Sequence, residues 1–368
     1  MLRRLYIDNF QAFVNFELRF DRKQLILGRN GSGKSSMLVA LLKLRQFVAR
    51  GDRAEDTFFP QERTRWMDHP RQTWELELEL ESETYLYRLV IEHVDGQTKP
   101  VVIEESIHCG GKPVFGFSAG VVQLYSDRFE LDVSYPFDPH RSALATIQPR
   151  ADKRVLSRFL NWLPKLLFFR LNPFNMGLRA EGEDLAPNVD LSNFSAWYRH
   201  LVQTFPRENV EFLNSLQSSI DDFGYLQLES AGENLRILTA EFHSQNGRDV
   251  KYGFQQLSEG QRCLISLYAI LHFVLIRECT VFIDEPDNFI SLREIQPWLM
   301  AADDLIEEGR GQLFLISHHP ELINQWAPHS GIRFFREKGG PVRSKPFIGD
   351  RSSLLTPSEM ISRGWEGE

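Results

Sequence analysis

The stretch GRNGSGKSS, residues 28–36, constrains the fold of this chain more than any other part of the sequence. It follows a short apolar strand, LILG, and precedes SMLVALLKLRQFVA, whose apolar spacing favours a helix. From Gly28 to Ser35 it fits the pattern G-x-x-x-x-G-K-[ST]. The alternative is a glycine-rich turn that merely caps a helix. Because the strand and the helix are both present, the stretch predicts a phosphate-binding loop at a helix N-terminus.

Each residue type in this loop suits a triphosphate. The glycines let main-chain N–H groups approach the ligand, Lys34 supplies charge for the β and γ phosphates, and the Ser35 hydroxyl is a ligand for magnesium. The predicted binding set comprises Gly28, Asn30, Gly31, Ser32, Gly33, Lys34, Ser35 and Ser36.

Two adjacent carboxylates end a later apolar strand. In TVFIDEPDN, the strand Thr280–Ile283 leads into Asp284, placed to hold magnesium, and Glu285, placed to polarise a water. An acidic surface turn would explain the pair if it stood alone. After a phosphate-binding loop, the pair indicates hydrolysis.

Two further motifs lie on either side of that strand. In LSEGQR, residues 257–262, Ser258 and Gln261 have capping-box spacing, which would explain the local pattern without any ligand. In LFLISHHPEL, a strand, Leu313–Ile316, is followed by two histidines, which at a strand end are more often structural than catalytic. Neither motif decides the function by itself.

In this order, the four motifs resemble ABC-type ATPase heads of the SMC and RecF kind. Within these they are most similar to AAA family ATPases of prokaryotic genomes with IDEP and THxP motifs, a group that includes OLD-family and several anti-phage defence ATPases. The resemblance implies an α/β fold with a mixed central sheet, an antiparallel β subdomain at the N-terminal side and a helical/β signature lobe. It implies one head over residues 1–368, with lobe I at approximately 1–135 and 278–345 and lobe II at approximately 140–277.

The resemblance also implies an activity, the hydrolysis of ATP to ADP and phosphate with Mg²⁺. Two copies would close head to tail over two ATP molecules. Ser258, Gly260 and Gln261 of one copy would complete the site of the other, with Ser35 and Asp284 as metal ligands and Glu285 as catalytic base. His318 rather than His319 matches the histidine of THxP.

Three positions depart from the family pattern. The aspartate of the D-loop falls on Ser291, and an arginine often found after the first strand falls on Gln11. The Q-loop glutamine is Gln148, Gln123 or absent.

Composition and sequence pattern bear on the cellular location of such a head and on the further domains that it could carry. Three cysteines without a CxxC pair fit a reducing cytosol, and the N-terminus lacks the apolar core of a signal peptide. The longest apolar run, Cys263–Ile276, is shorter than a membrane span and predicts a buried helix. In WELELEL, residues 74–80, the alternation predicts a strand with three glutamates facing outward, which would repel a phosphate backbone. We therefore expect a cytoplasmic protein. Without a sustained heptad run we expect no long coiled-coil arm, and the roughly fifty residues after His318 are too few for a fused nuclease domain of the OLD-family type.

The cellular role is open between hypotheses. The leading one is a regulatory ATPase whose closure gates a separately encoded effector, such as a nuclease, in anti-phage defence or DNA surveillance. The alternative is a RecF-like clamp that binds DNA directly in recombination or repair, through basic residues within 141–158, although a solvated helix face also explains them. A transporter ATPase ranks last.

Overall fold

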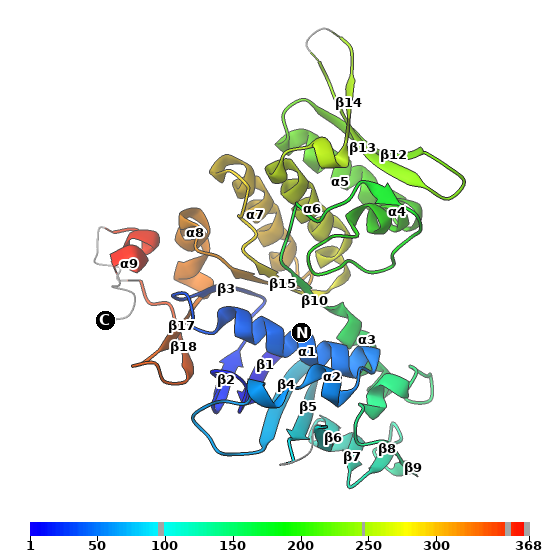
Figure 1. The fold of residues 1–368 in the computed structure, drawn as a ribbon, viewed down its shortest axis with the longest axis vertical. Helices are drawn as coiled ribbons and strands as arrows, with labels where there is room; N and C mark the ends of the chain where they lie inside the picture. The colour runs from blue at the N-terminus through cyan, green and yellow to red at the C-terminus, as the bar shows by residue number, and fades with distance from the viewer. Residues whose placement is uncertain (95–98, 245–246, 350–354, 364–368) are drawn as a thin grey trace. The chain divides into compact units, whose positions relative to one another are not determined.

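The computed structural model describes residues 1–94, 99–244, 247–349 and 355–363 (Figure 1). It divides into two compact units. Unit 1 comprises residues 1–166 and 327–349, and unit 2 comprises residues 167–326 and 355–363. The two compact units do not test the lobe boundaries implied by the family resemblance, because those lobes are defined by the elements of the nucleotide site. The lobe boundaries therefore stay a prediction.

Unit 1 contains an antiparallel eight-stranded sheet in the order β2-β1-β4-β5-β6-β7-β8-β9. Its strands are β1 (Leu2–Asp8), β2 (Phe16–Arg19), β4 (Arg71–Leu80), β5 (Glu83–Glu92), β6 (Val101–Cys109), β7 (Lys112–Ser118), β8 (Val121–Tyr125) and β9 (Leu131–Pro136). A second group of strands, β3 (Lys23–Leu27), β17 (Gly331–Arg336) and β18 (Val342–Pro346), has a parallel β3–β17 pair and an antiparallel β17–β18 pair. The helices are α1 (Lys34–Arg50), α2 (Ala54–Thr57) and α3 (Arg154–Trp162).

Aromatic packing joins α1 to the eight-stranded sheet. The ring of Phe47 on α1 lies 5.1 Å from that of Phe58, and Phe58 lies 4.9 Å from Trp74 on β4. All three side chains are fully buried. Each therefore removes a large apolar surface from water, and together they fix α1 where it follows β3 and the glycine loop.

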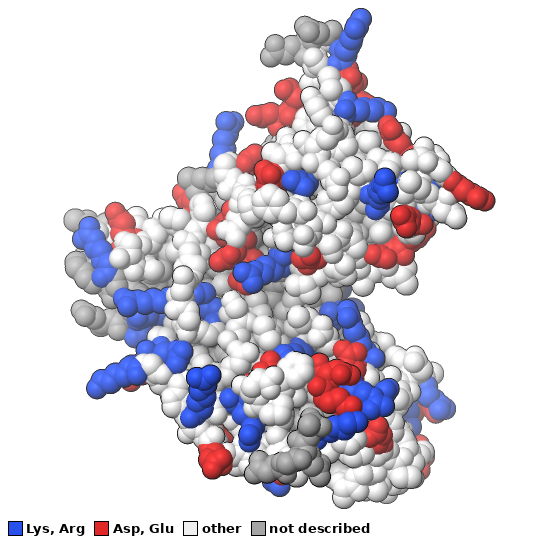
Figure 2. Space-filling view, viewed as in Figure 1, with Lys and Arg blue, Asp and Glu red and all other residues white. Residues whose placement is uncertain are grey.

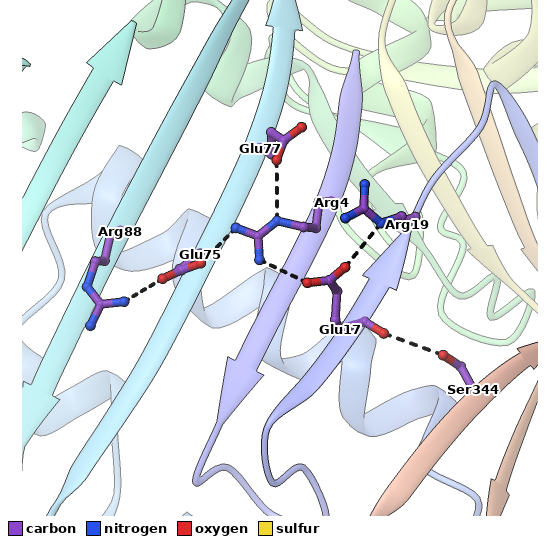
Figure 3. Close-up of polar contacts among 7 residues, drawn as sticks. All are labelled: Arg4, Glu17, Arg19, Glu75, Glu77, Arg88 and Ser344. Atoms are coloured by element: carbon purple, nitrogen blue, oxygen red, sulfur yellow. Dashed lines mark hydrogen bonds and ion pairs between the residues drawn. The ribbon is translucent and has the colours of Figure 1, made fainter. Parts of the chain in front are cut away.

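The outward glutamates of β4 are neutralised, contrary to the predicted repulsive face. Arg4 on β1 donates to Glu75 at 2.7 Å and lies 3.4 Å from Glu77, while Arg88 on β5 also pairs with Glu75 (Figure 3). Arg3 pairs with Glu79 at 2.5 Å. The apolar side of the alternation is as predicted for Trp74, Leu76 and Leu78, which are buried.

Unit 2 is built around a buried helix. Its helices are α4 (Phe194–Thr204), α5 (Pro206–Ser219), α6 (Glu259–Phe273), α7 (Leu292–Glu307) and α9 (Pro357–Arg363), and α8 (Pro320–Ser330) crosses into unit 1. Figure 1 shows α5 and α7 beside α6. Trp298 on α7 is fully buried and donates its indole N–H to the carbonyl of Leu267 on α6 at 2.9 Å.

The strands of unit 2 form two groups. A small antiparallel sheet contains β11 (Arg179–Ala180), β12 (Phe223–Ser230), β13 (Arg236–Phe242) and β14 (Val250–Gly253). The second group contains β10 (Leu166–Phe169), β15 (Thr280–Asp284) and β16 (Gln312–Ile316), with β15 between the other two and parallel to β16. Because β15 and β16 are parallel, their carboxyl ends, which carry the predicted catalytic side chains, lie at the same edge.

A buried carboxyl in unit 1 makes stability depend on pH. Burial raises the pKa of Glu105 from 4.5 to about 7, although the hydroxyls of Ser142 and Tyr87 donate to it at 2.6 and 3.0 Å. The folded protein therefore holds this proton more tightly than the unfolded chain. Consequently, the contribution of this proton to the free energy of unfolding is present below pH 4.5 and is lost as the pH rises towards 7.

Glu105→Gln should remove this dependence. Between pH 4 and pH 8, the free energy of unfolding of the wild type should fall by about 3 kcal/mol more than that of the variant. Urea unfolding across that range measures it, with the exposed Glu130→Gln as the matched control. Parallel pH profiles for wild type and Glu105→Gln would show that Glu105 keeps its ordinary pKa.

Candidate functional site

The glycine loop passes close to the β17–β18 hairpin. Gly28 and Gly33 have φ angles of 149° and 103°, which side chains disfavour. A Cβ at Gly28 would collide with the carbonyl oxygen of Phe334, and one at Gly33 would lie 2.6 Å from the Val342 side chain. Both positions therefore require glycine for their backbone conformation and for space.

The start of α1 is suited to an anion. Gly33 is its N-cap residue, and in this fully described segment no side chain caps the helix and the first turn carries no acidic residue. The first N–H groups of a helix lack partners within the helix and carry the positive end of its dipole. A phosphate group fits this position, so the geometry suits the predicted triphosphate.

Lys34 is held over the loop. Its side chain is 7% exposed, and its ammonium donates to the carbonyl oxygens of Gly28 at 2.5 Å and Arg29 at 3.3 Å. Phosphate oxygens bound in the loop would replace these carbonyls as acceptors. Ser35, on the first turn of α1, is exposed to solvent, as a metal ligand must be before the metal arrives.

At the end of β15, Asp284 lies near a cation that the sequence did not reveal. Asp284 is 5% exposed, and Nε of Arg170, which directly follows β10, lies 3.9 Å from its Oδ2 atom. Neither predicted Q-loop glutamine follows β10: Gln123 lies on β8, and Gln148 is exposed in a connection of unit 1. The residue that directly follows β10 and lies near Asp284 is Arg170.

Glu285 has a constrained backbone and an oriented side chain. Its φ of 54° is unusual for a residue other than glycine, and its N–H donates to the carbonyl of Ile316 at 2.8 Å. Asn288 donates its side-chain amide to Oε2 of Glu285 at 2.7 Å. Asn288 was missed in the sequence, although its position three residues after Glu285 was a signal that could have identified it.

The turns after β15 and β16 are linked. Ser317 is fully buried and donates its hydroxyl to Asp287 at 2.6 Å, and it accepts the N–H of His319 at 2.9 Å. Nδ1 of His319 in turn accepts the N–H of Glu321 on the first turn of α8 at 3.2 Å. His318, by contrast, is exposed. This arrangement favours His318 for contact with a ligand.

The LSEGQR motif, residues 257–262, called the signature motif below, forms the start of α6. Ser258 is its N-cap residue and accepts the N–H of Gln261 at 3.2 Å, while the Gln261 side chain accepts the N–H of Ser258 at 3.1 Å. The capping box expected from the spacing is present. Position 260 requires glycine for a separate reason, because a Cβ there would lie 2.6 Å from the carbonyl oxygen of Phe289.

Ser291, which stands where the family has an aspartate, begins α7. It is the N-cap residue, and its hydroxyl donates to Glu294 at 2.5 Å in a second capping box. A helix-capping role explains a serine at this position.

The predicted site residues are divided between the units. Unit 1 holds the glycine loop, residues 28–36, including the metal ligand Ser35, and unit 2 holds Ser258, Gly260, Gln261, Asp284, Glu285 and His318. Within unit 2, the structure places Glu285 and the motif after β16 on neighbouring turns, and Gly260 against Phe289. Residue assignments to ATP and Mg²⁺ stay predictions.

Four of the five basic residues within 141–158 are ion-paired. Arg150 pairs with Asp152 at 2.8 Å, Lys153 with Asp132 at 2.5 Å, Arg154 with Asp127 at 3.3 Å and Arg158 with Glu81 at 2.6 Å. Acidic and basic side chains also lie beside one another at several places on the face in Figure 2. The ion pairs reduce the charge available to a phosphate backbone, so they favour the solvated-face explanation.

Comparison with known families identifies the chain. A family model described as "AAA domain, putative AbiEii toxin, Type IV TA system" matches residues 123–324, which is more than half of the 368 residues. The chain belongs to this AAA domain family. A second model, described as "AAA domain", matches residues 4–115 of this AAA-family chain. Among curated protein sequences, none is significantly similar to it.

Solved structures show the fold of this AAA-family chain. An SMC head domain from Thermotoga maritima is 15% identical with a TM-score of 0.50, covering 95% of this chain and 99% of the SMC chain. A Pyrococcus furiosus Smc head with an extended coiled coil, bound to the C-terminal domain of ScpA, is 11% identical with a TM-score of 0.53, covering 94% and 96%. The chain thus has the fold of an SMC head domain, and the predicted α/β fold is confirmed.

One segment of the described chain is long and apolar enough to cross a membrane. It is Glu259–Arg277, which extends the apolar run noted in the sequence to 19 residues. In the structure, 72% of it is buried, as in the core helix of a folded domain.

Proposed function

We propose that this AAA-family chain binds and hydrolyses ATP, closes over it as a pair of heads, and thereby regulates a separately encoded effector protein. The observation that carries the proposal is the uncapped start of α1 beneath a glycine loop, with Lys34 already positioned over that loop. The family description, a putative toxin of a toxin–antitoxin system, supports a role in prokaryotic anti-phage defence. We place the protein in the cytoplasm, with any nuclease activity on its partner.

Each residue has a distinct task in this proposal. Lys34 and the first N–H groups of α1 hold the phosphates, Ser35 and Asp284 hold Mg²⁺, and Glu285 accepts a proton from the attacking water. Bound Mg²⁺ would neutralise charge on the β and γ phosphates. His318 contacts the γ phosphate.

Dimerisation gives the signature motif its role. Ser258, Gly260 and Gln261 of a second copy approach the phosphates bound by the first copy. The solved Smc heads bound to ScpA domains support the coarser idea that heads of this fold bind partner proteins. The competing clamp hypothesis is less supported, because four of the five basic residues within 141–158 are ion-paired.

Ser258→Arg should abolish steady-state hydrolysis and ATP-dependent dimerisation while leaving ATP binding to the isolated head. The bulky cation is placed where the partner's phosphates must approach, and the variant's own glycine loop is unchanged. Hydrolysis assays and size-exclusion chromatography with ATP measure the two effects. Ser218→Arg, an exposed change on α5, is the matched control and should behave like the wild type.

Mixing the variant with Lys34→Ala tests the composite site. A mixed dimer joins the intact loop of one chain to the intact signature motif of the other, so about one working site of two is restored. Partial recovery of hydrolysis supports the head-to-tail arrangement. If exchange of chains is demonstrated and no activity returns, a cysteine crosslink from near Ser258 to near Lys34 of the partner decides whether the motif acts across the dimer.

A further inference from the structure

An exposed arginine lies beside the two carboxylates at the end of β15. The neighbouring strand β10 is hydrogen-bonded to β15 and ends at Phe169, so Arg170 follows it directly. Nε of Arg170 lies 3.9 Å from Oδ2 of Asp284, and Glu285 is the next residue along the chain from Asp284. A positive charge therefore lies next to the proposed metal ligand and the proposed base.

The main chain at Arg170 is held in place from two sides. The rings of Phe168 on β10 and Phe282 on β15 are buried and stacked, with centroids 5.4 Å apart. The N–H of Arg170 itself donates to the carbonyl of Val189 at 2.8 Å. The start of the side chain is thus fixed before a ligand arrives, so less ordering is needed on binding.

The guanidinium of Arg170 has no hydrogen-bond acceptor among the described residues. Its separation from Asp284, 3.9 Å, is longer than a hydrogen bond, and 68% of the side chain is exposed. A structural arginine of the same unit differs in both respects: the side chain of Arg262 is 8% exposed and donates to the carbonyl of Pro173 at 2.5 Å. Arg170 can therefore turn towards a ligand without breaking a hydrogen bond.

The charges at this edge call for a cation. A triphosphate that approaches Asp284 and Glu285 meets two carboxylates, and like charges repel strongly where water is excluded. None of the predicted site residues of unit 2, all of which the structure describes, is a lysine or an arginine. A guanidinium donates to phosphate oxygens through two parallel N–H groups and stays charged, so Arg170 is suited to offset this repulsion.

We propose that Arg170 is a catalytic residue that binds the γ phosphate and stabilises its charge during hydrolysis. In that reaction the oxygen of water bonds to the γ phosphorus, the bond from that phosphorus to the bridging oxygen of ADP breaks, and Glu285 takes a proton from the water. Charge is spread over the γ oxygens in the transition state, where a fixed cation lowers the barrier. The inference rests on the proposed function and deepens it.

Arg170→Ala should lower the rate of hydrolysis at saturating ATP about 10²-fold, a typical loss when one donor to a transition-state charge is removed. Affinity for a non-hydrolysable ATP analogue should fall, whereas affinity for ADP, which has no γ phosphate, should be unchanged. Phosphate release and titration calorimetry of the full chain with Mg²⁺ measure these effects. Arg310→Ala, which removes an exposed arginine just before β16, is the matched control and should behave like the wild type.

Further variants test whether the contact is direct. Arg170→Lys keeps the charge and should retain more activity than Arg170→Gln, which keeps hydrogen-bonding groups without the charge. Free guanidinium ion, at concentrations too low to unfold the protein, should restore part of the activity of Arg170→Ala and none of that of Glu285→Gln. A free ion replaces a side chain that contacts the substrate, but it does not replace one that only supports the fold.

The outcomes separate this inference from the function on which it rests. If the wild type hydrolyses ATP and Arg170→Ala does so equally well, Arg170 is not catalytic and the function of the glycine loop stands. Equal losses of ADP and analogue binding, with a lower melting temperature and no rescue by guanidinium, would overturn the inference in favour of a structural ion pair with Asp284. If the wild type binds no nucleotide, the function proposed for the loop fails, and the role of Arg170 fails with it.

Discussion

Lys34→Ala is expected to abolish measurable ATP binding while leaving the fold intact. The ammonium is the charge that the loop presents to the β and γ phosphates, and it already lies over the loop carbonyls of Gly28 and Arg29. Removing it leaves the negative charge of the triphosphate without its main side-chain counterpart. Titration calorimetry with ATP and Mg²⁺ measures the loss, and circular dichroism verifies the fold.

The matched control is Lys165→Ala, because Lys165 is also in unit 1 but is exposed and lies outside the loop. It makes the same chemical change and should bind ATP like the wild type. Undiminished affinity in Lys34→Ala would refute the assignment of residues 28–35 as a phosphate-binding loop, and with it the proposed function.

Glu285→Gln should separate binding from chemistry. The amide keeps the shape of the side chain but cannot accept a proton from water, so hydrolysis should fall about 10²-fold or more. ATP binding and ATP-dependent dimerisation should persist. Phosphate release assays under saturating ATP, together with light scattering, measure both effects.

Glu278→Gln is the control, since Glu278 is an exposed carboxylate just before the other end of β15. Asn288→Ala should give a smaller loss than Glu285→Gln, because it removes the group that orients Glu285 but keeps the base. Normal turnover in Glu285→Gln would assign the activation of water to another residue.

Local patterns predicted the elements around the site well. The apolar spacing after the glycine loop predicted α1, and the spacing of Ser258 and Gln261 predicted the cap of α6. These features depend on neighbours along the chain, so their physical cause is visible in the sequence. β7 was missed because its sequence, KPVFGFS, contains proline and glycine. β9 was also missed, although its sequence, LDVSYP, alternates apolar and polar side chains.

Contacts between distant residues could not be predicted in the same way. Arg170 reaches Asp284 only because β10 lies beside β15, and nothing near Arg170 in the sequence indicates that neighbour. The arginines that neutralise the β4 glutamates lie on β1 and β5. Trp66 and Arg336 are distant in sequence and meet through the fold of unit 1. For these residues, the ion pairs and ring contacts depend on which strands and segments the fold brings together.

The contact between Gly260 and the carbonyl of Phe289 has a consequence for how nucleotide state would be transmitted. Phe289 belongs to the turn that follows Glu285, and Gly260 belongs to the first turn of α6, so the segment that carries the proposed base abuts the segment proposed to face a second copy. Main chain packed against main chain has no flexible side chain to absorb a displacement. A movement of the turn during hydrolysis would therefore shift the start of α6 as well. In the proposed dimer, this shift would be transmitted to the partner head.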